Sequence, residues 1–156
     1  MKKIKLKKIN NLSRAVLVVA GSDPSGGAGI QADLKTLTSF GVYGMTAITA
    51  LTEQNTNGVF DIFEIPVEFV LKQINCCLSD INVNAVKIGM LHNAELISAV
   101  LAALNDHNIV SNKNINIILD PVMVAKGGHK LLKEDAIDAL KNFIHLAKPI
   151  LTPNIP

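Results

Sequence analysis

The chain has 156 residues, of which 49% are hydrophobic and only 4% aromatic, so it has room for one α/β domain with an aliphatic core. No stretch approaches the roughly 20 uninterrupted apolar residues that span a bilayer, so we expect no membrane association. The formal net charge of +2 includes five lysines within the first eight residues. The other ten basic and thirteen acidic residues sum to −3, which predicts no nucleic-acid partner.

Residues 1–12 are interpreted as a Lys-rich N-terminal extension and residues 13–156 as the folded part. The extension lacks the apolar stretch and small-residue cleavage site of a signal peptide. The two cysteines, Cys76 and Cys77, are adjacent, so they cannot form a framework of structural disulfides. We therefore expect a cytoplasmic protein in which both are small apolar residues of a helix.

The first half of the chain alternates predicted strands and helices. The aliphatic run Ala15–Ala20 predicts a buried strand, and the glycine-rich segment Gly21–Gly29 predicts a loop that leads into a helix over residues 30–40. A second strand is expected over residues 45–51. Val59–Ile65 alternates apolar and acidic residues, which predicts a strand with one solvent-facing side.

The second half continues this alternation. Pro66 suits the first turn of a helix through Leu78, and Asn93 is a preferred cap for a helix to about His107. Strands separated by helices imply right-handed crossovers, so the predicted fold class is α/β, a three-layer αβα arrangement with a mostly parallel sheet. The remaining expected elements are strands over residues 85–88, 115–119 and 149–151, and a helix over residues 133–146.

Four polar or glycine-rich segments directly follow predicted core strands. Ligands of open α/β sheets bind beyond the carboxyl ends of the strands, so we expect these segments to meet at one edge of the sheet. They are Gly21–Gly29, Thr52–Asn57, Gly89–His92 and Asp120–Gly128.

The first of these segments, GSDPSGGAG, has four glycines in nine residues, which would let its backbone approach a ligand closely. It contains neither the Gly-Lys-Ser/Thr of a P-loop nor the spacing of a dinucleotide fingerprint. A tight turn without a ligand remains an alternative. Asp33, one turn into the next helix, faces either this pocket or solvent, and the glycine loop before it favours the pocket.

Gln54 lies in the polar cluster Thr52–Asn57, and its amide could both donate to and accept from the edge of a ligand; a hydrophilic turn is the alternative. Asp120, after the fourth core strand, could orient a metal ion or act near phosphate charge, or simply begin a turn before Pro121. The histidines and cysteines show no zinc-ligand spacing, so no metal site of that kind is expected.

Taken together, these segments resemble the hydroxymethylpyrimidine/phosphomethylpyrimidine kinases of thiamine biosynthesis, which have a ribokinase-like fold. The resemblance runs in the family's order through nearly the whole chain beyond the extension. It is carried by AGSDPSGGAGIQADLKT (Ala20–Thr36), ITALTEQNT (Ile48–Thr56), KIGML (Lys87–Leu91), LDPVMVAKGG (Leu119–Gly128) and LTPN (Leu151–Asn154).

The resemblance implies a substrate site and two cofactors. Gln54 would pair with the aminopyrimidine ring, Asp33 and Gly21 would lie at the same pocket, and Met90 and Val122 would sandwich the ring. Asp120 would lie near the phosphates and the metal. The family transfers the γ-phosphate of ATP, with Mg²⁺, to the hydroxymethyl oxygen and then phosphorylates the monophosphate again.

The chain also departs from the family pattern. The family's nucleotide-binding loops, its late glycine-rich phosphate loop and the cysteine thought to act as base would follow Thr152-Pro153-Asn154, so the chain resembles the N-terminal part alone and contains no catalytic residue of its own. Cys76 and Cys77 lie in a predicted amphipathic helix and would not replace that loop. We therefore expect weak pyrimidine binding and no measurable phosphorylation.

Two other readings stay open. One is a pyridoxal-type kinase, since relatives accept both heterocycles. The other is a non-catalytic remnant or the half of a split enzyme, completed by a C-terminal polypeptide or by a homo-oligomer, because the last predicted strand would leave an open, apolar sheet edge.

Overall fold

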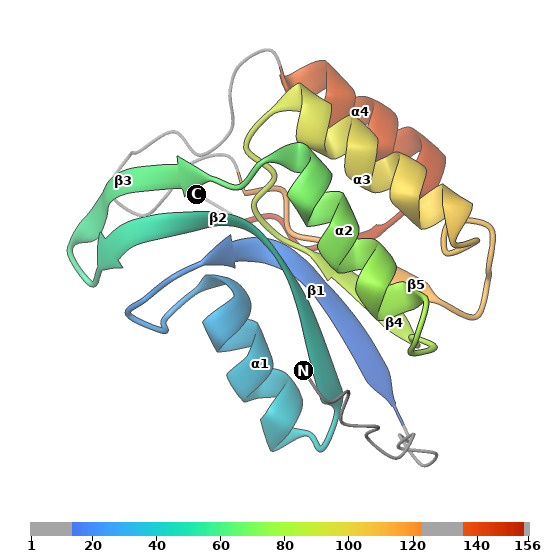
Figure 1. The fold of residues 1–156 in the computed structure, drawn as a ribbon, viewed down its shortest axis with the longest axis horizontal. Coiled ribbons are helices and arrows are strands. Elements are labelled where there is room, and N and C mark those ends of the chain that lie inside the picture. Colours follow the sequence, from blue (N-terminus) through green and yellow to red (C-terminus); the bar gives the residue numbers. More distant parts are fainter. Residues whose placement is uncertain (1–13, 123–135, 155–156) are drawn as a thin grey trace, which may run out of the picture.

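The computed structural model describes residues 14–122 and 136–154, which form one sheet flanked by helices (Figure 1). The strands lie in the order β3-β2-β1-β4-β5-β6, and all neighbouring pairs are parallel except β2 and β3. The strands are β1 (Ala15–Ser22), β2 (Tyr43–Asn55), β3 (Gly58–Glu64), β4 (Ala85–Ile88), β5 (Asn116–Leu119) and β6 (Ile150–Leu151), and the helices are α1 (Gly29–Ser39), α2 (Val67–Leu78), α3 (Ala94–Asp106) and α4 (Ala136–Ala147).

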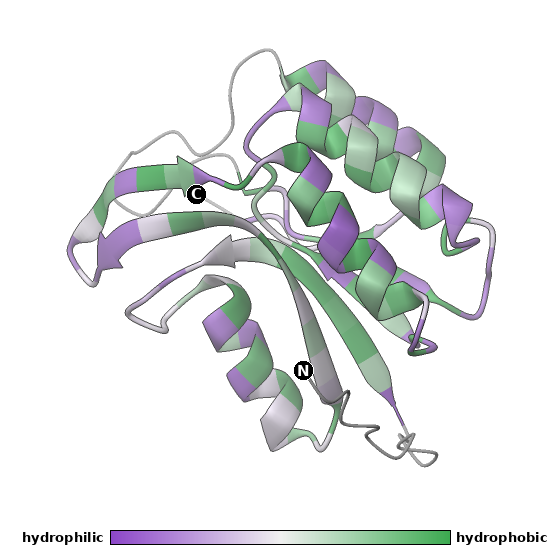
Figure 2. Cartoon of the chain, in the orientation of Figure 1, coloured by the Kyte–Doolittle hydropathy of each residue, from purple (hydrophilic) through white to green (hydrophobic). Residues whose placement is uncertain are grey.

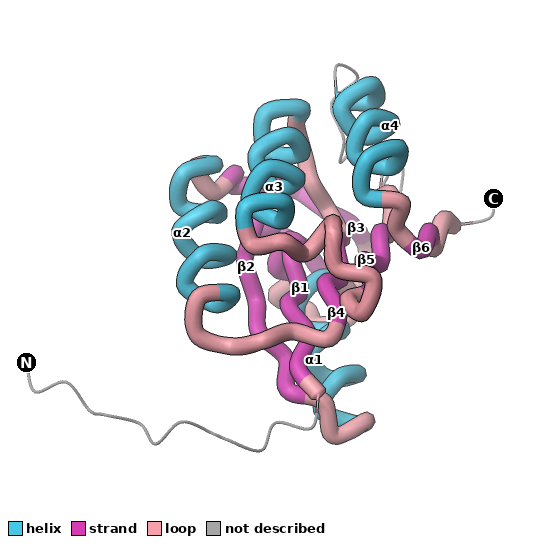
Figure 3. The backbone as a smooth tube through the Cα atoms, turned by 90° about the vertical axis from the view of Figure 1, so that its right-hand side faces the viewer, coloured by secondary structure: helices cyan, strands magenta, loops and turns pink. Residues whose placement is uncertain are grey.

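Helices cover both faces of the sheet. Helix α1 packs against β1 and β2 on one face, whereas α2, α3 and α4 lie side by side on the other (Figures 1 and 3). The predicted three-layer αβα class with a mostly parallel sheet is therefore confirmed. Among the described residues, no helix is both long and apolar enough to cross a bilayer.

The core is divided unequally between the two faces. Alternate residues of β1 point to opposite sides, so Leu17 and Val19 join the large cluster beneath α2–α4, while Val18 and Ala20 join a small cluster with Ile30 of α1. Both sets are almost fully buried, which explains why β1 is a continuous aliphatic run. Figure 2 shows hydrophobic central strands beneath helices whose hydrophilic residues face outward.

The second strand is longer than predicted, and this corrects one expectation. The segment Thr52–Asn57 is expected to follow a strand over residues 45–51, but β2 continues to Asn55, and only Thr56 and Asn57 form the turn. The cause is antiparallel pairing with β3, from Ala50 opposite Glu64 to Asn55 opposite Gly58. This pairing satisfies the backbone groups of residues whose polar side chains suggested a loop.

The other boundaries agree with the predictions to within a few residues. Asn93 caps α3, because its Oδ1 accepts a hydrogen bond of 2.8 Å from the Leu96 N–H. Pro66 precedes α2 as its cap and does not form its first turn. Of the helix predicted over residues 133–146, the first three residues lie outside the described part of the chain, as do most of Asp120–Gly128 and the N-terminal extension.

Candidate functional site

A pocket of about 270 Å³ lies where β1, β2, β4, β5 and β6 end, and we call it the carboxyl-edge pocket. This is the edge at which open α/β sheets bind ligands. Its described lining comes from all of these strand ends and from the first loop. The lining residues are Ala20, Gly21, Ser22, Asp23, Ala28, Gly29, Thr52, Gln54, Val59, Lys87, Gly89, Met90, Asp120, Val122 and Asn154.

Five of the six residues singled out from the sequence meet at this pocket, although they are up to about a hundred residues apart in the chain. They are Gly21, Gln54, Met90, Asp120 and Val122. The sixth, Asp33, does not belong to the described lining. It lies behind the pocket on α1, where it pairs with a lining residue.

The first loop is folded around the carboxylate of Asp23, which is only 3% exposed. One carboxylate oxygen accepts from the N–H and hydroxyl of Ser25, at 2.8 and 2.7 Å, and the other accepts from the N–H groups of Gly27 and Ala28, at 3.0 and 2.8 Å. Burial alone would raise the pKa of Asp23, but these hydrogen bonds outweigh burial and hold that pKa below its ordinary value. The carboxylate therefore fixes the shape of the loop.

Glycines at two positions allow backbone and side chains to approach closely. A Cβ on Gly29, whose φ is +56°, would collide with the carbonyl oxygen of Gly21, so only glycine fits where the loop enters α1. A Cβ on Gly21 would lie 2.8 Å from the terminal methyl of Met90. Gly21 thus leaves room for the Met90 side chain at the pocket.

Gln54 is oriented by its neighbours on two strands. The Thr52 hydroxyl lies 2.9 Å from the Ser22 carbonyl oxygen and 3.2 Å from Gln54 Oε1. The register between β2 and β3 shifts next to Gln54, so that Val59 stands opposite it and both residues line the pocket. Such irregularities turn side chains toward sites at sheet edges.

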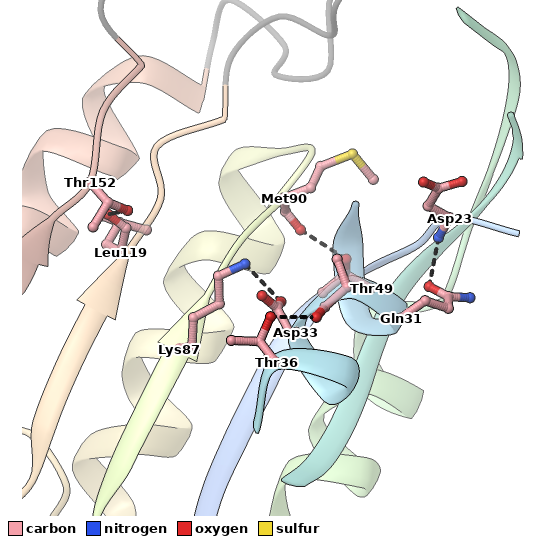
Figure 4. A network of polar contacts seen from close by, with 10 residues as sticks. Asp23, Gln31, Asp33, Thr36, Thr49, Lys87, Met90, Leu119 and Thr152 are labelled. Atoms are coloured by element: carbon pink, nitrogen blue, oxygen red, sulfur yellow. Dashed lines mark hydrogen bonds and ion pairs between the residues drawn. The ribbon is translucent and has the colours of Figure 1, made fainter. Parts of the chain in front are cut away.

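Two apolar residues from neighbouring strand ends complete this side of the pocket. Met90 is 8% exposed, and its carbonyl oxygen accepts a hydrogen bond of 2.8 Å from the hydroxyl of the buried Thr49 (Figure 4). Val122 is half-buried just beyond β5. Together they give the pocket an apolar surface beside the polar Gln54.

Asp33 and Lys87 form a partly buried ion pair next to the pocket. Lys87 Nζ lies 2.8 Å from Asp33 Oδ2, and the two side chains are 24% and 23% exposed (Figure 4). Lys87 projects from β4, whereas Asp33 comes from the first turns of α1. The pair therefore joins α1 to the middle of the sheet, with the ammonium on the pocket side.

Asp120 contributes a buried carboxylate oxygen to the site. Its Oδ1 is buried and has no hydrogen-bond partner within the described part of the chain. Burial raises the pKa of Asp120, the Lys87 ammonium opposes this, and Asp33 reinforces it. A buried acceptor without a donor is costly in a folded chain, so this oxygen is suited to a ligand or a cation.

Sequence reasoning did not single out Lys87, Asp23 or Asn154. A signal for Lys87 was present, since it is the one charged residue in the short strand β4, whose other members are Ala85, Val86 and Ile88. Its partner Asp33 lies far away in the chain, so the ion pair could not be read from local pattern. Asp23 and Asn154 belong to quoted motifs, but nothing in the residues themselves indicated their orientation.

The described residues could bind Mg²⁺ only together with oxygen ligands from another molecule. They contain no group of three or more His, Cys, Asp or Glu side chains arranged to hold a metal ion. Mg²⁺ is commonly bound through one or two carboxylates together with substrate phosphates and water. The unpartnered oxygen of Asp120 fits that role.

The cysteines lie away from this site. Cys76 and Cys77 are on α2, and neither lines the carboxyl-edge pocket. Burial, with smaller contributions from Cys76 and Asp80, raises the pKa of Cys77, which disfavours its thiolate.

Known proteins with similar sequences include hydroxymethylpyrimidine/phosphomethylpyrimidine kinases and a protein of thiamine biosynthesis. A hydroxymethylpyrimidine/phosphomethylpyrimidine kinase of Haemophilus influenzae is 48% identical over 92% of this chain and 51% of its own length. A thiamine biosynthesis bifunctional protein of Geobacter sulfurreducens is 49% identical over 91% of this chain and 28% of its own length. This chain thus spans about half the length, or less, of the curated relatives it matches.

Solved structures of kinases also match the fold of this chain. A phosphomethylpyrimidine kinase from Clostridium difficile matches with a TM-score of 0.80 and 44% identity, over 92% of this chain and 60% of that one. A Bacillus subtilis pyridoxal kinase in complex with ADP matches with a TM-score of 0.74 and 33% identity, over 90% of this chain and 50% of that one. The family model described as phosphomethylpyrimidine kinase matches residues 23–156. The chain therefore belongs to the phosphomethylpyrimidine kinase family.

Proposed function

We propose that this chain carries the substrate pocket of a hydroxymethylpyrimidine/phosphomethylpyrimidine kinase, which uses ATP and Mg²⁺ to phosphorylate 4-amino-5-hydroxymethyl-2-methylpyrimidine and then its monophosphate in thiamine biosynthesis. The supporting observation is the convergence of Gln54, Met90 and Val122, from three strand ends, on one cavity. Family membership supports the same substrate.

The proposed role of Gln54 follows from its hydrogen-bonding groups. The Thr52 hydroxyl lies within hydrogen-bonding distance of Oε1, which leaves the second lone pair of Oε1 and both Nε2 hydrogens for a ligand. An aminopyrimidine offers an exocyclic amine to that oxygen and a ring nitrogen to that amide. Met90 and Val122 would contact the two faces of the flat ring, and Gly21 would keep the space beside Met90 open.

Asp120 would hold Mg²⁺ through its buried oxygen, and ATP would supply the phosphoryl group when bound. The portion of the relatives that this chain does not match is expected to contain the glycine-rich phosphate loop. We therefore propose that the 156-residue chain binds the pyrimidine but does not transfer phosphate at a useful rate.

Calorimetric titration of the chain with hydroxymethylpyrimidine tests the proposed pocket. Gln54→Ala should weaken binding about 10- to 100-fold, because two hydrogen bonds to the ring are lost. The matched control is Glu53→Gln, next to Gln54 but outside the pocket lining, and it should bind like the wild type. Equal affinities of wild type and Gln54→Ala would contradict the proposed role of Gln54.

Phosphate transfer is tested separately. The chain and the full-length Haemophilus influenzae relative are incubated with ATP, Mg²⁺ and hydroxymethylpyrimidine, and the phosphorylated product is measured. We expect product from the relative and none above background from the chain. Turnover by the chain at a rate comparable with the relative would overturn the second part of the proposal.

A pyridoxal-type kinase is the second candidate function, because a pyridoxal kinase shares the fold. The higher identity to pyrimidine kinases, 48% against 33%, favours the pyrimidine. Pyridoxine lacks the amine and adjacent ring nitrogen that Gln54 is proposed to pair with. A titration in which pyridoxine binds more tightly than hydroxymethylpyrimidine would reverse this preference.

A further inference from the structure

Lys87 is the only basic residue in the lining of the carboxyl-edge pocket, as far as the described residues go. It projects from the central strand β4, between β1 and β5, where Val18 and Ile118 are its neighbours in register. A lysine placed between apolar strands loses part of its hydration, so an anionic partner is needed to stabilise its charge. Asp33 supplies one such partner, at 2.8 Å.

The Lys87 ammonium has two close neighbours in the described structure, the Asp33 carboxylate and Gly89. Apart from the contact with Asp33, it lies close to the backbone of Gly89, since a Cβ there would be 3.2 Å from Lys87 Nζ. An ammonium group has three N–H donors, and the described structure uses one of them, toward Asp33. Within the described part of the chain, two donors therefore remain for a ligand, and the absence of a side chain at Gly89 leaves room for the ammonium.

The ion pair between Asp33 and Lys87 is oriented with its ammonium toward the pocket. Lys87 lines the cavity, whereas Asp33 does not. The other acidic groups of the described lining are Asp23, whose two oxygens are bound by the first loop, and Asp120, whose Oδ1 is unpartnered. Among the described residues of this pocket, a phosphorylated ligand would thus meet a single cationic group, Lys87.

We propose that Lys87, positioned by Asp33, binds the phosphate of the monophosphorylated pyrimidine and so distinguishes it from the free alcohol. This inference rests on the proposed function, because it assumes that the ring occupies the pocket beside Gln54. A phosphate monoester carries close to two negative charges at neutral pH and has strong acceptor oxygens, which match the free donors of an ammonium. The phosphates of ATP share this chemistry and are separated from the monoester in the test.

The test measures binding by calorimetry and does not require turnover. Wild type, Lys87→Met and Lys87→Arg are titrated with hydroxymethylpyrimidine, with its monophosphate and with ATP. Lys87→Met should weaken monophosphate binding about 10- to 100-fold and change binding of the alcohol less than about threefold. Lys87→Arg keeps the charge and should recover part of the loss.

The matched control is Lys141→Met. Lys141 forms a similar Lys–Asp contact, 3.0 Å from Asp138, but it is 71% exposed on α4 and outside the pocket lining. Its removal should leave both affinities unchanged. Thermal unfolding of each variant reports whether it is folded, and if the methionine variant is not, Lys87→Gln compared with Lys87→Arg carries the same test.

A pH profile separates a charge contact from a structural role. The monoester gains its second charge near pH 6, so wild-type affinity for the monophosphate should rise between about pH 5 and about pH 7.5. Asp23, Asp33 and Asp120 are the other charged groups of this region, and all three are present in both the wild type and the variant. Lys87→Met should show a flatter rise than wild type, and parallel profiles would overturn the proposal.

The outcomes also separate this inference from the proposed function. If Lys87→Met weakens the alcohol and the monophosphate equally, or weakens ATP alone, Lys87 does not recognise the monoester, and the pyrimidine pocket still stands. If wild type binds neither pyrimidine, the proposed function fails and the inference fails with it. Selective loss of the monophosphate supports both.

Discussion

Two hollows of similar size lie at opposite edges of this sheet and differ in chemistry. The carboxyl-edge pocket, about 270 Å³, has three charged groups in its described lining, Asp23, Lys87 and Asp120. The other hollow, about 300 Å³, lies where β4 and β5 begin, and we call it the amino-edge hollow. It is lined by Leu78, Ile81, Asn82, Val83, Asn84, His107, Ile109, Asn112, Asn114 and Ile115.

Several polar groups of the amino-edge hollow form hydrogen bonds within the fold. Asn84 exchanges two hydrogen bonds with the backbone of Ala15, at 2.9 and 2.8 Å, and Asn112 Oδ1 accepts from the Asn114 N–H at 3.0 Å. At the carboxyl edge, by contrast, Asp120 Oδ1 and two N–H groups of Lys87 lack partners within the described residues. Among the described residues, a buried oxygen without a partner therefore distinguishes the candidate site from the amino-edge hollow, and volume alone does not.

The largest expected effect lies in the loop that shapes the carboxyl-edge pocket. Asp23→Ala removes the acceptor of four hydrogen bonds and should lower the free energy of unfolding by about 2–3 kcal/mol. Asn112→Ala, its counterpart in the amino-edge hollow, removes one exposed turn contact and should change stability by less than about 0.5 kcal/mol. Urea denaturation measures both, and equal losses would contradict the contrast between the edges.

The lowered pKa of Asp23 predicts how the stability of the fold depends on pH. Because the pKa of Asp23 is lowered on folding, its stabilising contribution is fully present above its ordinary value of 3.8 and is lost as the pH falls through the folded pKa. The stability difference between wild type and Asp23→Ala should therefore narrow in acid. Repeating the urea titrations at about pH 7 and about pH 3 measures this, and a constant difference would refute it.

Glycine substitutions separate backbone strain from steric collision. Gly29→Ala combines a positive φ of +56° with a collision against the Gly21 carbonyl, and should cost about 2 kcal/mol. Gly41→Ala, with φ +66° and no atom within 4 Å of a new Cβ, should cost about 1 kcal/mol. Thermal unfolding compares the two variants, and a smaller loss at Gly29 would show that the close approach at the pocket is not required.

Asp120→Asn should stabilise the fold, by about 1 kcal/mol, at the expense of the site. The raised pKa of Asp120 means that its ionised form is disfavoured on folding; this cost is absent well below its ordinary value of 3.8 and complete above the folded pKa. The gain from asparagine should therefore grow as the pH rises from about 3 to about 7. A destabilised variant at neutral pH would show that Asp120 has a favourable partner.

Gly21→Ala should have the smallest effect on stability, within about 0.5 kcal/mol, because the atom that a new methyl meets is the movable end of Met90. Its effect should appear in binding, with affinity for hydroxymethylpyrimidine reduced about tenfold as the cavity narrows. Gly58→Ala, where a Cβ meets no atom within 4 Å, is the control. Unchanged affinity in Gly21→Ala would place the ring elsewhere.

Much of the fold could be predicted from the sequence because its signals are local. Aliphatic runs marked the buried strands, and Asn93 marked the start of α3. The extension of β2 through Thr52–Asn55 could not be predicted, because polar side chains indicate a loop and only pairing with the distant β3 makes a strand of them. Local propensity was overridden there by tertiary contact.

The position of the candidate site could be predicted from the sequence, but the contacts between its residues could not. Parallel strands bring their carboxyl ends to one edge, which accounts for the meeting of Gln54, Met90 and Val122. The ion pair between Asp33 and Lys87 depends on how α1 packs over β4, and no local pattern encodes that distance. Its position beside the pocket had therefore to come from the structure.

We propose above that the pyrimidine ring binds at the carboxyl edge of the sheet and not at the amino edge. Amide chemical-shift changes during titration of the labelled chain with hydroxymethylpyrimidine test it directly. We expect the largest changes at the amides of Gly21, Gln54 and Met90, and no change at those of Asn84 and Asn112. Changes centred on the amino-edge hollow, or none at saturating ligand, would contradict it.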